Sequence, residues 1–132
     1  QFIVPFILLF ALYVVFHGHY SPGGGFQGGA MIAGALILLR LTQGDGAVLA
    51  LSKSSAELLA LAGVALFAGV GLLCLLSGGR FLDYAALPMS MEAPYLRYYG
   101  ILAVELGVTL GVAGVLVLIS QTLSGAQESE ED

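Results

Sequence analysis

The chain alternates between long apolar runs and short polar or glycine-rich stretches. Four apolar segments carry almost no charge, and they cover about residues 1–17, 27–42, 55–77 and 98–121. A helix needs about 20 mostly apolar residues to cross the roughly 30 Å hydrocarbon core of a bilayer. The pattern therefore predicts an all-α integral membrane protein, with four transmembrane helices within residues 1–123.

Polar signals mark the ends of some of these segments. Ser54–Glu57 has the pattern of a capping box and predicts the start of the third helix. Ser77–Gly79 predicts its end, because glycine commonly stops helices. The acidic residues 124–132 follow the fourth apolar segment, and we expect this tail to be disordered.

The second apolar segment is short for a membrane span. Ala30–Leu41 would give a helix of about 18 Å, which is well under the thickness of the hydrocarbon core. The helix must therefore extend back into Gly23–Gly29, which predicts a glycine-rich loop embedded in the membrane between the first two helices. Irregular backbone at that depth is tolerated only where protein or water covers it. This favours partner subunits or a water-filled cavity.

Composition supports the membrane assignment and excludes several functions. Hydrophobic residues make up 58% of the chain and charged residues only 10%, and the mean hydropathy is +0.96. A soluble domain has about 25% charged residues, so an ordinary soluble enzyme is excluded. Only four residues are Lys or Arg, too few for a nucleic-acid surface. The single cysteine, Cys74, allows no disulfide framework, and we expect no metal or cofactor.

The basic residues leave the membrane orientation open. Arg40 and Lys53 would lie on one side, and Arg80 and Arg97 on the other. The positive-inside rule therefore gives no preference. The sequence starts at Gln1 directly in apolar residues, so we expect further residues upstream.

Glu105 is the only acidic residue inside the fourth apolar segment. It lies about 8 Å beyond Gly100, the expected start of the helix. Thr109 shares its helix face, so both residues are candidates for an ion or proton path, or for a structural hydrogen bond to a partner helix. The opposite face carries small residues suited to close helix packing. These are Gly107, Gly111 and Gly114.

Between the first two helices lie His17, His19 and a run of glycines. Gly23–Gly28 matches G-x-G-x-x-G, but no strand or acidic residue supports a dinucleotide site. The glycines indicate either tight packing or a half-helix whose N-terminus faces a cavity. The two histidines indicate either interfacial hydrogen bonding or proton relay, since histidine titrates near neutral pH.

The string GHYSPGGGFQGG at residues 18–29, followed by a short apolar helix, resembles the signature of the B subunit (MnhB/MrpB type) of multisubunit sodium/proton antiporters. Related ion-pumping membrane hydrogenase complexes contain the same module. The resemblance implies a non-enzymatic four-helix subunit of a large complex in a prokaryotic cell membrane, with other membrane subunits, lipid, sodium ions and protons as partners. The motif residues are Gly18, His19, Pro22, Gly23, Gly24, Gly25, Phe26, Gly28 and Gly29.

Two other functions remain open at this stage. One is a stand-alone small multidrug-type transporter coupled to protons. Such proteins usually carry an essential glutamate in the first helix, and Phe2–Phe16 contains none. The other is a purely structural subunit that helps the complex assemble and conducts no ion.

Overall fold

The computed structural model describes residues 2–18, 24–44 and 51–128. Within these ranges all regular secondary structure is helical, without strands, which confirms the all-α part of the predicted fold class. Four α-helices follow one another, and a short 3-10 helix lies between the last two. They are α1 (Ile3–His17), α2 (Gly25–Gln43), α3 (Lys53–Leu76), η2 (Tyr84–Ala86) and α4 (Ala93–Glu128).

Three of these helices are long and apolar enough to cross a membrane, namely α2, α3 and α4. The first helix, α1, is equally apolar but has 15 residues, which is short for a span. Length and composition thus support three of the four predicted membrane helices directly.

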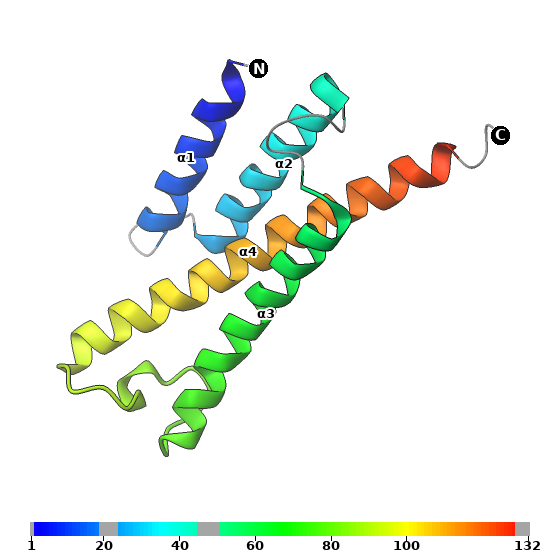
Figure 1. Cartoon of the computed structure of the whole chain (residues 1–132). Helices are drawn as coiled ribbons and strands as arrows, with labels where there is room; N and C mark the ends of the chain where they lie inside the picture. Colours follow the sequence, from blue (N-terminus) through cyan, green and yellow to red (C-terminus); the bar gives the residue numbers. More distant parts are fainter. Residues whose placement is uncertain (1, 19–23, 45–50, 129–132) are drawn as a thin grey trace.

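The helices lie side by side in the order α1, α2, α4, α3 (Figure 1). The last helix, α4, lies between α2 and α3, while α1 packs mainly against α2. Among the described residues, α1 makes no close contact with α3. The arrangement is therefore a row of helices rather than a closed bundle, and both sides of the row expose apolar side chains.

Small residues bring α3 and α4 into close contact. A Cβ atom added to Gly63 would overlap the backbone nitrogen of Gly111 and lie 2.5 Å from the carbonyl oxygen of Gly107. A Cβ atom on Gly114 would lie 2.8 Å from the carbonyl oxygen of Ala56. Helices in lipid associate through this kind of backbone approach. Glycine at these positions therefore sets the spacing between α3 and α4.

Small apolar clusters hold the other helices together. One joins α1 to α2 and consists of Val4, Ala35 and Leu39. A second joins α2, α3 and α4 and consists of Ala33, Ala56 and Val117. Each cluster contains alanine, two of the three residues in the second, which again favours close approach of the helix backbones.

The start of α3 differs from the sequence prediction. The helix begins at Lys53, and its N-cap is Ser52, whose Oγ accepts a hydrogen bond of 3.1 Å from the backbone of Ser55. The predicted capping box at Ser54–Glu57 is therefore wrong by about half a turn. Several serines in succession can each cap a helix, and extended backbone at Ser52 selects the first of them.

The end of α3 is as predicted. Gly78 has a φ of 86°, and its N–H donates to Leu75 O at 3.0 Å. The N–H of Gly79 donates to Cys74 O at 3.1 Å. These two bonds form a Schellman motif, which satisfies carbonyl groups that a helix end leaves open.

The fourth helix is longer than predicted at both ends. It begins at Ala93 rather than near residue 98, because Pro94 in the first turn has no N–H to leave unsatisfied. It also continues to Glu128, where the sequence predicted a disordered tail from residue 124. Extending a helix that has already formed costs little, and residues 126–128 are acceptable helix formers. Residues 129–132 of the predicted tail lie outside the described part.

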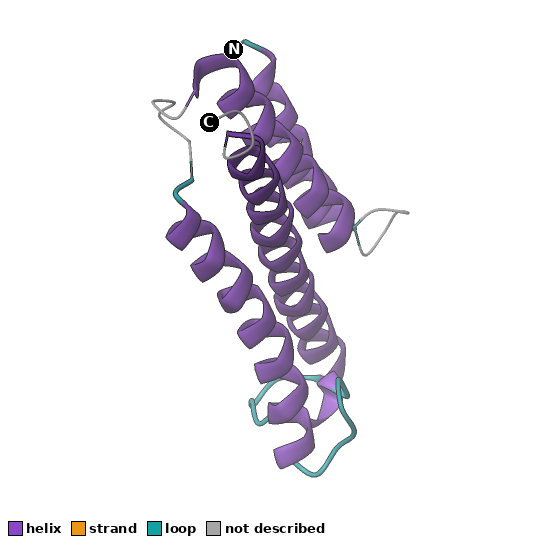
Figure 2. Cartoon of the chain, turned by 90° about the vertical axis from the view of Figure 1, so that its right-hand side faces the viewer, coloured by secondary structure: helices purple, strands orange, loops and turns teal. Residues whose placement is uncertain are grey.

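The connection between α3 and α4 packs back onto both helices at one end of the row (Figure 2). A Cβ atom on Gly71 would overlap the ring of Phe81, and one on Gly100 would overlap the ring of Tyr84. Leu87 joins a buried cluster with residues of both helices.

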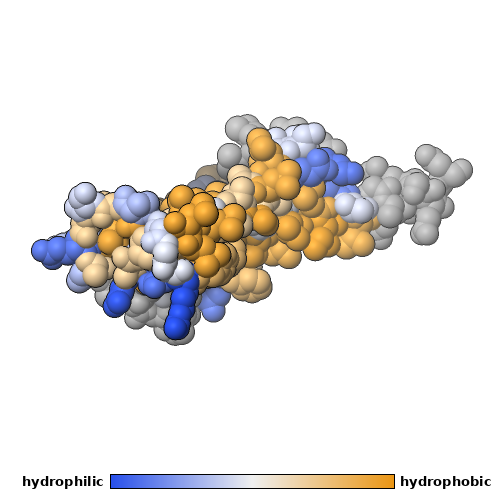
Figure 3. All heavy atoms as spheres, turned by 90° about the horizontal axis from the view of Figure 1, so that it is seen from below, coloured by the Kyte–Doolittle hydropathy of each residue, from blue (hydrophilic) through white to orange (hydrophobic). Residues whose placement is uncertain are grey.

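Apolar residues cover much of the face seen from below, and hydrophilic residues gather in separate patches (Figure 3).

Labelling of single cysteines tests the topology. We expect Ser54→Cys and Ser90→Cys, both in a Cys74→Ala background, to react with an impermeant maleimide from opposite sides of the membrane, because α3 joins these two exposed positions. Labelling of both from the same side would contradict the assignment of α3 as a membrane span.

Candidate functional site

Glycines form the beginning of α2, where it meets α1 and α4. The helix starts at Gly25, and its N-cap, Gly24, has a φ of 127°. Residues with side chains rarely adopt this backbone conformation. Gly25–Gly29 is helical, so α2 extends back into the glycine-rich segment, as expected from the short apolar run.

Three glycines of α2 let its backbone touch two other helices. A Cβ atom on Gly25 would overlap the carbonyl oxygen of Glu105 in α4, and one on Gly29 would lie 2.7 Å from the carbonyl oxygen of Thr109. A Cβ atom on Gly28 would overlap the side chain of Val15 in α1. The first two turns of α2 therefore have no room for side chains on either of these sides.

The carboxylate of Glu105 lies where α1 ends and α2 begins. A Cβ atom on Gly18 would lie 3.1 Å from Glu105 Oε1, and one on Gly24 would lie 3.5 Å from the same oxygen. The other oxygen, Oε2, is buried. Gly18 and Gly24 also approach each other closely, since a Cβ atom on Gly18 would overlap the Cα of Gly24. We call Gly18, Gly24, Gly25 and Glu105 the glycine junction.

The glycine junction lies well inside the row of helices. Because α4 begins at Ala93, Glu105 is about 18 Å along its axis, rather than the 8 Å expected from a start at Gly100. The hairpin of α1 and α2 also stops short of the end that α3 and α4 reach together (Figures 1 and 2). The end of α1, the start of α2 and the carboxylate of Glu105 therefore lie close together.

Thr109 lies one turn beyond Glu105 and is buried. Its hydroxyl donates a hydrogen bond of 2.7 Å to the carbonyl oxygen of Glu105. This proton is therefore engaged by the helix itself. The geometry places Thr109 next to Glu105, as predicted from their shared helix face, but directed to the backbone rather than to a partner helix.

His17 is the last residue of α1 and is exposed. Its Nδ1 lies 3.2 Å from the carbonyl oxygen of Tyr13, and its ring stacks on the Tyr13 ring with centroids 4.2 Å apart. The predicted candidates His19, Pro22 and Gly23 lie outside the described residues.

The glycines of α4 face away from the glycine junction. Gly107 and Gly114 lie against α3, where added Cβ atoms would meet the backbones of Gly63 and Ala60. Gly111 packs less tightly, since its added Cβ would meet only the Cα of Gly63 at 4.0 Å. The fourth helix thus has one face against α3 and another against α2.

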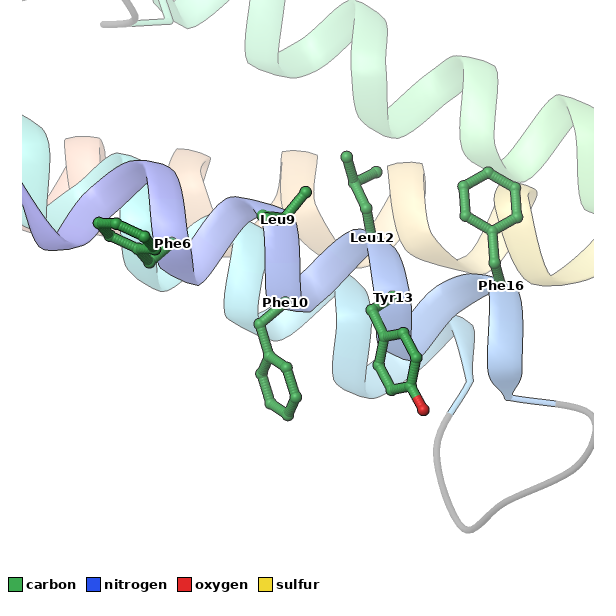
Figure 4. A pocket seen from close by; sticks show the side chains of 6 residues that line it. All are labelled: Phe6, Leu9, Phe10, Leu12, Tyr13 and Phe16. Carbon is green, nitrogen blue, oxygen red and sulfur yellow. The ribbon is translucent and has the colours of Figure 1, made fainter.

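The outer face of α1 carries large apolar side chains around a shallow hollow (Figure 4). Leu12 and Phe16 point to one side of the helix, while Phe10 and Tyr13 point to the other (Figure 4). Residues of α1 alone line this hollow, and α1 therefore provides an apolar surface rather than an enclosed site.

Comparison with known proteins shows the family of this chain. The family described as a domain related to the MnhB subunit of Na+/H+ antiporters matches residues 1–118. The chain belongs to the MnhB family. It is 37% identical over 130 residues to "Putative antiporter subunit mnhB2" of Staphylococcus haemolyticus (strain JCSC1435), covering 95% of this chain and 90% of that protein. It is 32% identical over 129 residues to the protein of the same name from Staphylococcus aureus (strain MRSA252), with the same coverage.

In this member of the MnhB family, the sequence did not reveal that Glu105 contacts the glycine string. The two are about 80 residues apart, and no local pattern connects them. It also did not single out Gly63, which packs against α4 but lies within a continuous apolar run. A small residue facing the small residues of another predicted helix was the one available signal.

Two glycines of α2 offer a matched test of the packing. We expect Gly25→Ala to lower the yield of assembled complex, because its methyl group would overlap Glu105 O; overpacking of this kind costs about 1–3 kcal/mol. Gly34→Ala on the same helix should leave the yield unchanged, since no atom lies within 4 Å of the added Cβ. Gln27→Ala should also be mild, because Gln27 is exposed. Equal yields for Gly25→Ala and Gly34→Ala would contradict this packing.

Proposed function

We propose that this chain is a small, non-enzymatic membrane subunit of a multisubunit Na+/H+ antiporter. Membership of the MnhB family supports this, as do two relatives named as antiporter subunits. Three apolar helices of spanning length support a place in the membrane. We further propose that α1 is the fourth membrane helix and that the protein is multi-pass in a prokaryotic cell membrane.

The observation that carries this proposal is the glycine junction. A break between two helices inside a layer of apolar helices exposes backbone groups that lipid cannot satisfy. An acidic side chain at such a place is costly in hydrocarbon, and in membrane proteins it usually marks an ion or proton path. Discontinuous helices that meet charged groups are typical of ion-coupled transporters.

The row of helices supports a role among partner subunits. Many large apolar side chains on α1 and α3 are exposed, and the hairpin of α1 and α2 covers only part of α4. Other subunits of the antiporter and the lipid bilayer cover these surfaces. Sodium ions and protons then pass near the candidate residues His17, His19, Glu105 and Thr109.

The alternatives are distinguished by particular residues. A stand-alone multidrug-type transporter is disfavoured, because Ile3–His17 contains no acidic residue. A purely structural subunit is favoured by the hydroxyl of Thr109, which bonds to the helix backbone. The glycine junction fits a subunit of an ion-pumping hydrogenase module equally well, so it does not separate that alternative from the antiporter.

Dependence on partner subunits can be measured directly. We expect the chain expressed alone to give low yields of aggregating protein without antiport activity, and co-expression with the other antiporter subunits to restore a stable complex. The reason is that lipid would otherwise contact backbone groups at the glycine junction, at several kcal/mol for each unsatisfied group. A stable, monodisperse and fully active preparation of the chain alone would contradict the proposal.

Two substitutions separate a transport role of Glu105 from a purely structural one. Glu105→Gln keeps the shape of the side chain, so the complex should assemble normally while cation-dependent proton flux in vesicles falls several-fold or shifts its pH profile. Glu105→Leu should lower the yield of complex as well. Flux is normalised to assembled complex. Normal flux with a normal pH profile in Glu105→Gln would favour the structural subunit.

A further inference from the structure

The N-terminus of α2 lacks the usual groups that stabilise a helix start. The first four N–H groups of a helix have no partner within it, and a Ser, Thr, Asp or Asn side chain commonly caps them. The N-cap here is Gly24, which has no side chain to cap the helix, and the first turn of α2 has no acidic residue. The positive end of the α2 dipole is thus without local compensation, in surroundings that are largely apolar.

Glu105 brings a negative group to this end from α4. Its Oε1 lies 3.5 Å from the position of a Cβ atom on Gly24, the N-cap residue. The backbone of the same residue packs directly on Gly25, the first residue of the helix. Because the backbones of α2 and α4 are in direct contact here, the carboxylate lies close to the start of α2.

We infer that Glu105 is the counter-charge for the N-terminus of α2, and that its protonation loosens the glycine junction. Glu105 is then a positioning residue, which acts on α2 rather than binding the cation itself. The positive end of a helix repels cations, so the same contact disfavours sodium at this carboxylate. The link to antiport rests on the proposed function, whereas the link between Glu105 and α2 does not.

Few other ionisable groups face this contact within the described residues. The first two turns of α2 have none, and neither does the part of α3 that packs against α4 at this level. His17 ends α1, and Arg97 lies about 12 Å before Glu105 along α4. The charge of Glu105 also acts on Tyr84 in η2. Burial raises the pKa of Tyr84, and the charges of Cys74 and Glu105 raise it further.

Hydrogen exchange measured by mass spectrometry on the assembled complex tests the inference. The readout is the exchange rate of a peptide covering residues 24–32, divided by that of a peptide from α3 covering residues 60–72 in the same digest. Lowering the pH from about 8 to about 4 carries an ordinary glutamate carboxylate through its usual pKa of about 4.3, whereas histidine changes charge earlier, near 6.5. The ratio removes the intrinsic effect of pH on exchange, which both peptides share.

In the wild-type complex we expect this ratio to rise about three- to tenfold as the pH falls, the range that loss of a helix-terminus charge implies. Glu105→Gln should give the high ratio at every pH, while Glu105→Asp should retain a pH-dependent ratio. Glu57→Gln is the matched control, since Glu57 is an exposed acid near the start of α3. It should behave as wild type.

A ratio that stays constant with pH in the wild-type complex would overturn the inference, as would wild-type behaviour of Glu105→Gln. If Glu105→Gln fails to assemble, the wild-type and Glu57→Gln complexes still decide. Proton flux is measured on the same wild-type preparation. An active antiporter with a constant ratio rejects the inference alone, and an inactive complex with a pH-dependent ratio rejects the proposed function alone.

Discussion

The backbone contact between Gly25 and Glu105 fixes most of the arrangement around it. Helices in lipid gain little from hydrophobic association, so they depend on close van der Waals contact and on satisfied backbone groups. At this contact the start of α2 rests directly on the main chain of α4, and Gly28, one turn later, rests on α1. These two close approaches therefore set the positions of three helices, and the first places the carboxylate of Glu105 where α1 ends and α2 begins.

The central helix, α4, packs against α3 and against α2 in different ways. Toward α3, small residues occur on both helices, with Gly107 and Gly114 facing Gly63 and Ala60. Toward α2, the small residues belong to the partner, so α4 can carry larger and polar side chains on that face, Glu105 among them. This asymmetry lets a single helix pack tightly on both sides and still present an acid. The outer faces of α1 and α3 carry many exposed apolar side chains, as expected of a subunit surrounded by lipid and other subunits.

The sequence predicted the number of helices well, because an apolar run of about 20 residues has few other stable forms in a membrane. It also predicted the stop at Ser77–Gly79, where glycine acts locally. It placed the start of α4 too late, since the helix begins at Ala93 and Pro94 is well suited to a first turn. The contact of Glu105 with Gly24 and Gly25 could not be predicted, because it depends on how two distant helices pack and not on any local pattern.

Gly24 affects both the packing around Glu105 and the charge at the start of α2. A Ser or Asp there would cap α2 locally, but its side chain would occupy the space next to Glu105 Oε1 and would have to adopt a φ of 127°. Glycine avoids both problems and leaves the helix end dependent on a group from α4. A serine cap would not respond to pH near neutrality, whereas a carboxylate brought from another helix can gain a proton. The absence of a local cap is therefore what would allow the protonation of one residue on α4 to change the start of α2, about 80 positions earlier in the chain.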